Sequence, residues 1–305
     1  MAFTAADVKK LREMTNVGMM DCKKALSETD GDMDKAVEYL REKGLAKAAK
    51  KAGRIAAEGM AYAAVIDGVG VVVEVNAETD FVGKNEKFVD FVKGVAATVA
   101  KANPADLDAL MECKYDGTDM TVTQQQQEMV LVIGENIKVR RFAFFTDGIS
   151  VPYVHAGGKI GVLVNLAVEG GVDATEIGKN VAMQIAALNP RFWDKSQVTE
   201  DVLAEEKKVA LALMDSDPKM ASKPEAVREK IVLGKLNKFY SENCLLQQAF
   251  VKENKVSVEK HVAEVAKQLG GKITVKAFTR FATGEGIEKK AVSYTHLTLP
   301  TKLEV

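Results

Sequence analysis

The sequence is poor in the features that define several large classes of protein. Aromatic residues make up only 6% of its 305 positions and include one tryptophan, so side chains on which nucleic-acid bases could stack are scarce. Its 42 basic and 43 acidic residues leave a formal net charge of −1, which provides no overall positive field to bind phosphates. We therefore expect no direct nucleic-acid partner.

Cysteines and long apolar runs are also limited. The three cysteines lie far apart and include no C-x-x-C pair, which excludes a disulfide framework and a zinc knuckle. No run approaches the roughly 20 apolar residues of a membrane span, and the N-terminus lacks the pattern of a signal peptide. We therefore expect a cytoplasmic protein with reduced cysteines and no membrane partner.

The common motifs of enzymes are missing as well. No Gly-Lys pair is followed by Ser or Thr as in a P-loop, and no complete G-x-G-x-x-G follows a strand. The histidines His155, His261 and His296 form no His-x-x-x-His pair, and G-x-S-x-G is absent. These absences predict no nucleotide hydrolysis, no cofactor, no metal site and no catalytic residue.

The sequence begins with a pattern of three short amphipathic helices in residues 4–43. Thr4 and Asp7 have the spacing of a capping pair at the start of the first helix. Gly44 is expected to end the third helix. The basic segment Lys47–Arg54 that follows is interpreted as a tether or a helical extension.

The pattern then changes to that of β-strands. Met60–Ile66 and Val71–Val75 are rich in strand-forming residues, and Asp67 and Gly68 between them suit a tight hairpin turn. A helical stretch follows and is expected to stop at Asn103, because proline comes next. The sequence therefore predicts a hairpin covered by a helix.

This unit recurs along the chain. Gly161–Glu169 resembles Gly70–Glu78, and Val181–Pro190 resembles Val95–Pro104, in the same order of strand, loop, helix and Asn-Pro. The shared order favours a duplication, so we predict an α+β fold whose core contains two related subdomains. Further strands are predicted at Ile137–Phe145 and Lys272–Phe281.

Residues 199–240 predict an antiparallel pair of helices inserted in this core. Val202, Val209 and Leu213 are spaced as a stripe on the first helix, and Ser222–Glu225 has the form of a capping box for the second. The polar composition suggests a short coiled-coil hairpin that projects from the core. It is either an arm without a site or a contact with a partner or a second copy.

Two segments differ from ordinary packing patterns. Asp80 and Phe81 lie in the loop that leaves a predicted strand. Either Thr79 or Asp80 caps the next helix while Phe81 packs on the core, or the loop has a function. Ile133–Ile137 likewise places Gly, Glu and Asn where a strand begins, as a simple turn or as part of a site. His155 is interpreted as a hairpin-tip residue.

At these positions the chain resembles the bacterial elongation factor Ts family, the guanine-nucleotide exchange factors for elongation factor Tu. Thr15–Leu26 is similar to the family's signature in its N-terminal domain of the ubiquitin-associated (UBA) type, and Asn76–Val82 is similar to its second signature. Ile133–Ile137 and Gly284–Lys289 match in the expected order. The resemblance covers about residues 5–290.

The resemblance implies a function without covalent chemistry. A family member binds elongation factor Tu in its GDP-bound and nucleotide-free states, and it speeds GDP release by disturbing the magnesium and phosphate site so that GTP can rebind. Asp80 and Phe81 would enter that site, with the aromatic ring as a wedge. The implied partner-binding residues are Asp80, Phe81, Thr79, Val82, Ile133, Gly134, His155, Lys23 and Lys51. The resemblance is compatible with a homodimer and with a 2:2 complex of the two proteins.

The expected organisation follows from these assignments. The units are a UBA-like three-helix domain (1–46), a basic tether (47–59), core subdomain N (60–148), core subdomain C (149–198 and 241–282), the hairpin insertion (199–240), the start of a C-terminal module (283–290) and a tail read as non-native (291–305). One rival interpretation is a small-molecule enzyme that uses Glu135 or His155 as an acid or base between the repeats. Another is a passive UBA-type adaptor.

Overall fold

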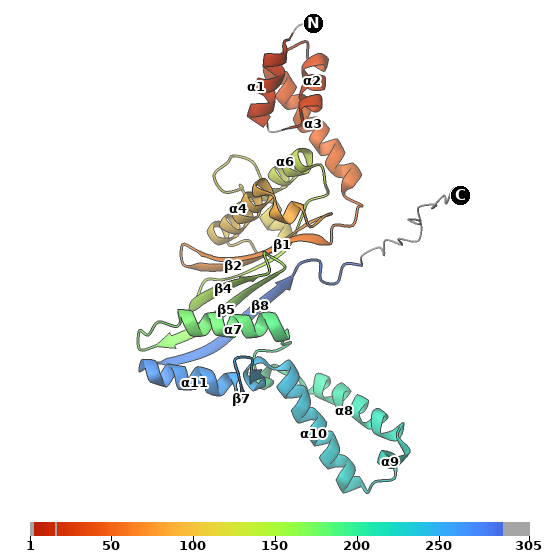
Figure 1. Ribbon diagram of the computed structural model, residues 1–305, viewed down its shortest axis with the longest axis vertical. Coiled ribbons are helices and arrows are strands. Elements are labelled where there is room, and N and C mark those ends of the chain that lie inside the picture. Colours follow the sequence, from red (N-terminus) through yellow and green to blue (C-terminus); the bar gives the residue numbers. More distant parts are fainter. Residues whose placement is uncertain (1–2, 16, 289–305) are drawn as a thin grey trace, which may run out of the picture.

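The computed structural model describes residues 3–15 and 17–288, so the predicted tail at 291–305 lies outside the described residues. Helices cover both outer faces of two stacked antiparallel sheets (Figure 1). This mixture of helices and sheets confirms the α+β class. The described elements are α1 (Ala5–Thr15), α2 (Met19–Glu28), α3 (Met33–Lys51), β1 (Glu58–Ile66), β2 (Val69–Ala77), η1 (Val82–Lys84), α4 (Glu86–Ala102), α5 (Leu107–Glu112), α6 (Val122–Ile133), β3 (Lys138–Phe145), β4 (Ile149–His155), β5 (Ile160–Glu169), α7 (Thr175–Leu188), η2 (Lys195–Gln197), α8 (Glu200–Asp215), α9 (Pro218–Ala221), α10 (Glu225–Asn243), η3 (Leu245–Gln247), β6 (Ala249–Phe250), β7 (Glu253–Ser257), α11 (Val258–Leu269) and β8 (Lys272–Ala282).

The first three helices pack around a small apolar core of their own, to which Leu11, Leu26 and Leu40 contribute. Thr4 begins α1 as predicted, because its amide donates to the Asp7 carboxylate while its hydroxyl accepts from the Asp7 amide. These reciprocal bonds satisfy amide groups that the first helical turn leaves without partners.

The third helix continues past Gly44, so the interpretation of the basic segment as a helical extension is confirmed as far as Lys51. Gly44 does not end α3, which continues to Lys51 and includes most of the basic segment. Gly44 is buried where α3 crosses α6, and a Cβ atom there would lie 3.3 Å from Leu131 Cδ2. The glycine therefore permits a close helix crossing, which local sequence cannot distinguish from a helix stop.

The first sheet has the strand order β1-β2-β3, with all pairs antiparallel. The predicted hairpin turn is confirmed, since Asp67 and Gly68 have φ values of 50° and 84°. One face of the sheet packs on α4, where Phe88 and Phe91 are buried. The central strand β2 is buried along almost its whole length, because its other face meets the second sheet.

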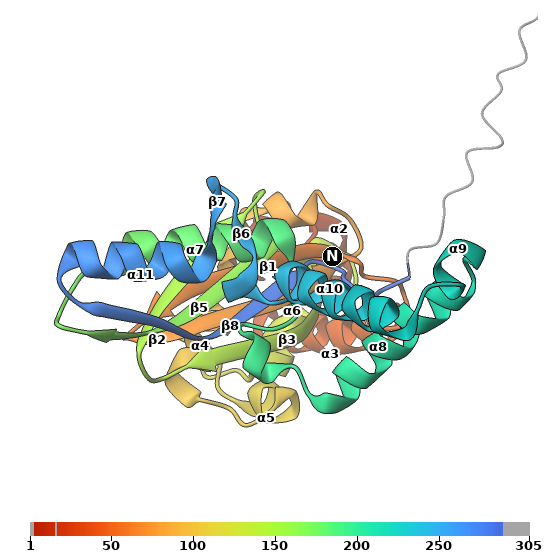
Figure 2. The same cartoon turned by 90° about the horizontal axis from the view of Figure 1, so that it is seen from below.

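The second sheet has the order β4-β5-β8, and α7 and α11 cover its outer face (Figure 2). Side chains from both sheets, among them Val72, Leu163 and Phe281, fill the layer between them. The predicted Asn-Pro stops are also confirmed. Asn103 ends α4 and Asn189 ends α7 in the left-handed region, with φ values of 45° and 47°.

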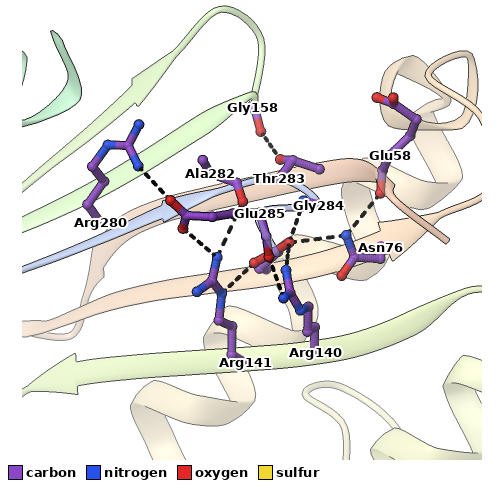
Figure 3. Close-up of polar contacts among 11 residues, drawn as sticks. Glu58, Asn76, Arg140, Arg141, Gly158, Arg280, Ala282, Thr283, Gly284 and Glu285 are labelled. Atoms are coloured by element: carbon purple, nitrogen blue, oxygen red, sulfur yellow. Dashed lines mark hydrogen bonds and ion pairs between the residues drawn. The ribbon is translucent and has the colours of Figure 1, made fainter. Parts of the chain in front are cut away.

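A buried carboxylate joins the two sheets. Glu74 on β2 is fully buried and forms ion pairs with Arg140 (3.0 Å) and Arg141 (2.5 Å) of β3. It also accepts a hydrogen bond of 2.8 Å from the amide of Gly284, which follows β8. Figure 3 shows how Arg141 reaches on to the Glu285 carboxylate, so that the segment after β8 is tied to the first sheet.

The helices α8 and α10 form an arm that points away from the sheets (Figure 1). The predicted stripe on α8 is partly wrong, since Val209 and Leu213 are 45% and 58% exposed. The neighbouring Ala210 and Met214 are buried instead, against Val232 of α10. Helical periodicity gave the spacing of the apolar residues, but the direction of the partner helix selects which of two adjacent stripes is buried.

The predicted capping box before α10 is also wrong. Pro224 occupies the N-cap position of α10, which has no side-chain cap. The Ser222 hydroxyl donates to the Lys219 carbonyl in the preceding short helix α9. Because the Ser222 hydroxyl is hydrogen-bonded to α9, it does not cap α10.

Candidate functional site

The loop after β2 presents an acidic residue and an aromatic residue to solvent. Asp80 is exposed, and Phe81 is 82% exposed, the largest value among the large apolar side chains described. Directly afterwards Val82 and Gly83 are buried and begin the short helix η1. The exposed pair therefore sits between two anchored stretches of chain.

The alternative in which this loop only caps and packs α4 is wrong. The cap of α4 is Asn85, whose Oδ1 accepts a hydrogen bond of 3.0 Å from the Lys87 amide. Phe81 packs into no core cluster of the described residues. A large aromatic side chain is thus left on the surface without a structural role within the described fold.

The turn between α6 and β3 lies beside this loop. Gly134 ends α6 with φ of 85°, a conformation that glycine adopts without strain. The Lys51 ammonium at the end of α3 donates to the Gly134 carbonyl. The structure thus brings Lys51 and Gly134, two of the predicted residues, into direct contact.

Hydrogen bonds connect the loop and the turn. Glu135 Oε2 accepts from the amides of Glu78 and Thr79, both at 3.0 Å, and its Oε1 accepts from the Thr79 hydroxyl at 2.7 Å. In the opposite direction Glu78 Oε1 accepts from the Asn136 amide at 2.7 Å. Two segments more than 50 residues apart in the sequence are therefore held together by reciprocal bonds.

The same junction includes the chain that follows α3. The Arg54 guanidinium lies 3.5 Å from the Glu78 carboxylate, and the Asn136 side chain donates to the Arg54 carbonyl at 2.8 Å. Sequence reasoning did not include Glu78, Arg54 or Asn136 in the site. Their only sequence signal was their place in, or next to, the segments already singled out.

An open groove of 520 Å³ lies between the loop and the turn. The exposed ring of Phe81 and the half-buried Ile133 both line it. Its full lining is Phe81, Val82, Asn85, Glu86, Lys87, Val132, Ile133 and Glu135. The structure therefore gathers Phe81, Val82 and Ile133 at one surface, as a common contact site requires.

His155 lies on a different element, at the end of β4, where its Nδ1 is 2.9 Å from the Tyr153 hydroxyl. The β4–β5 turn packs on β1, since the Ala61 amide donates to the Gly158 carbonyl at 2.7 Å. Lys23 is exposed on α2, in the N-terminal helices. The described contacts connect neither His155 nor Lys23 directly to the Asp80–Phe81 loop.

The geometry does not favour acid or base catalysis by Glu135. Both Glu135 oxygens accept hydrogen bonds from the loop, which leaves the carboxylate engaged in holding backbone. Among the described residues no group of three or more His, Cys, Asp or Glu side chains could hold a metal ion. Within the same residues no helix has the length and apolar character needed to cross a membrane.

Comparison with known proteins relates the whole chain to one family. The family model described as Elongation factor TS matches residues 78–285. Elongation factor Ts of Syntrophotalea carbinolica is 45% identical over 95% of this chain and 96% of the relative. Elongation factor Ts of Trichlorobacter lovleyi is 49% identical over 95% of both chains, and that of Clostridium perfringens (strain SM101) is 47% identical over 95% and 96%.

Proposed function

Because the chain belongs to the elongation factor Ts family, the guanine-nucleotide exchange factors of elongation factor Tu, we propose that its Asp80–Phe81 loop performs the exchange. The observation that carries this proposal is the 82% exposure of Phe81 on a loop whose flanking backbone is anchored. An exposed aromatic ring costs solvation free energy until a partner pocket buries it, and such anchors dominate interface energies.

The exchange depends on coupling between two binding events, that of this protein and that of GDP to elongation factor Tu. The protein and GDP each bind elongation factor Tu, but a complex that holds both is strained, so each ligand weakens the other by the same factor. Phe81 acts as the wedge near the magnesium and phosphate end of the nucleotide site. Asp80 adds a negative charge there, which disfavours bound phosphates. The protein thus binds the GDP-bound state, releases GDP, and stays on the nucleotide-free state until GTP rebinds.

The remaining predicted residues enlarge the contact. Thr79, Val82, Ile133 and Gly134 belong to the loop and turn around the groove, and Lys51 touches Gly134. We assign Lys23 and His155 to separate contacts, because they lie on α2 and on the β4–β5 hairpin. A partner that reached all three places would span both sheets and the N-terminal helices.

We also propose the finer organisation of the chain. The N-terminal helices act as a UBA-like domain, and the two sheets with α4 and α7 act as related subdomains, which their matching Asn caps support. The arm of α8 and α10 acts as an inserted coiled-coil hairpin, the segment from 283 starts a C-terminal module, and the protein works in the cytoplasm. No covalent chemistry and no resident cofactor are required.

Stopped-flow release of fluorescent GDP from purified elongation factor Tu tests the proposal. We expect release to accelerate with the concentration of this protein and to reach a plateau. No acceleration at micromolar concentrations contradicts the function. Binding without acceleration favours the adaptor, whereas saturable binding of a small metabolite by this chain alone favours the enzyme.

A further inference from the structure

Both oxygens of the Glu135 carboxylate accept hydrogen bonds from the loop that carries the exchange residues. Its two oxygens accept two backbone amides and one hydroxyl, all from Glu78 and Thr79. Hydrogen bonds to a charged acceptor are stronger than those between neutral groups. Three such bonds to one carboxylate fix the orientation of the carboxylate and of the loop groups that donate to it. A surface loop with no such acceptor would bond to water instead.

The loop is held on both sides of Asp80 and Phe81. On the β2 side, Glu135 holds Thr79. On the other side Gly83 is packed so closely on β1 that an added Cβ atom would lie 2.8 Å from the Gly59 carbonyl oxygen. The side chain of Phe81 is therefore exposed, but the backbone that carries it is anchored on both sides.

We propose that Glu135 is a positioning residue of nucleotide exchange, which acts by holding the loop so that Phe81 points into the partner. The inference rests on the proposed function, and it adds a residue that would be needed even without touching the partner. If only a fraction of free molecules present Phe81 correctly, the apparent dissociation constant rises by the inverse of that fraction. Glu135 keeps this fraction high.

A direct contact between Glu135 and the partner is the competing explanation, because Glu135 also lines the groove beside Phe81. The two explanations differ in how the variants combine. A residue that acts only by holding the loop has no further effect once the Asp80 and Phe81 side chains are both removed, whereas a residue with its own contact has an additive effect.

The experiment measures GDP release from elongation factor Tu at subsaturating concentrations of the full chain. Glu135→Ala should lower the second-order rate constant by roughly tenfold, the effect of losing about one net charged hydrogen bond. Glu135→Gln should lose less, because its amide oxygen still accepts from one donor. Glu112→Gln, which removes a carboxylate from the exposed side of α5, should match the unchanged protein.

The same variants are then made in a background that carries both Asp80→Ala and Phe81→Ala. We expect Glu135→Ala to change the rate less than twofold there, and equal factors in both backgrounds would overturn the positioning role. Amide hydrogen exchange at Glu78 and Thr79 should also become faster in Glu135→Ala, and unchanged exchange would overturn it too. If the unchanged protein accelerates GDP release while Glu135→Ala is equally active, this inference alone fails. If the unchanged protein has no effect, the proposed function fails with it.

Discussion

Truncating Phe81 to alanine should abolish most exchange activity at little cost to folding. A fully buried Phe→Ala change costs about 3–5 kcal/mol of unfolding free energy. Phe81 is 82% exposed, so less than a fifth of the side chain is buried in the free protein. Scaled by that fraction, the loss is roughly 0.6–1 kcal/mol, which corresponds to a melting temperature lower by at most about 4 °C.

The effect on the partner complex should be far larger. A central aromatic anchor contributes about 2–4 kcal/mol to binding, which is roughly a 30- to 1,000-fold change in an equilibrium constant. Stopped-flow GDP release at subsaturating concentrations should fall by a factor in this range. Asp80→Ala should also reduce release without a measurable change in melting temperature, because Asp80 is exposed.

The matched control is Phe250→Ala. Phe250 is 2% exposed in the core of the second sheet, so its truncation should cost about 3–5 kcal/mol of unfolding free energy. Exchange per folded molecule should nevertheless stay near normal. The reasoning is refuted if Phe81→Ala lowers the melting temperature as much as Phe250→Ala does while its exchange rate per folded molecule is unchanged.

Three further predictions concern the fold, a titration and the rim of the contact. Glu74→Ala leaves the partly buried Arg140 and Arg141 without their partner, which should lower the free energy of unfolding in denaturant by about 3–5 kcal/mol. Lys272→Ala, which breaks an exposed ion pair, should lower it by at most about 1 kcal/mol. Equal losses would show that the buried network does not join the sheets. Burial, followed by the charges of Asp90 and Asp116, raises the pKa of Tyr115 to about 12. The folded state therefore binds more protons than the unfolded state between about pH 10 and 12, so the stability that this group contributes is lost as pH rises through that window. The difference in tyrosinate absorbance between the unchanged protein and Tyr115→Phe should develop near pH 12. A difference centred near pH 10 would contradict the burial of Tyr115. Lys23→Ala should slow association a few-fold, with an effect that fades at high salt, while the plateau rate of GDP release stays the same; a lower plateau would place Lys23 at the exchange step.

Several elements could be predicted because their signals are local. The Asp67-Gly68 turn and the Asn103 and Asn189 caps require positive φ, and the residues that adopt it are few. Thr4 and Asp7 bond to each other across one helical turn. In each case the partner lies within a few residues, so the sequence contains the whole interaction.

Two of the wrong predictions involve a distant partner. Gly44 lies at a helix crossing with Leu131, and Met214 in place of Leu213 faces α10. A glycine that permits close packing and a glycine that ends a helix look the same in sequence. Likewise, two apolar stripes one residue apart are equally periodic until a neighbouring helix covers one of them.

The candidate site also has features that the sequence predicts and features that depend on distant contacts. The sequence by itself determined that Asp80 and Phe81 lie in a loop after a buried strand, and its motifs identified the family. Only the tertiary structure decided that Phe81 is exposed, that Glu135 holds its loop, and that Lys51 reaches Gly134. Exposure and hydrogen bonding depend on which segments meet in space, and Glu78 and Glu135 meet because β2 and β3 are paired in one sheet.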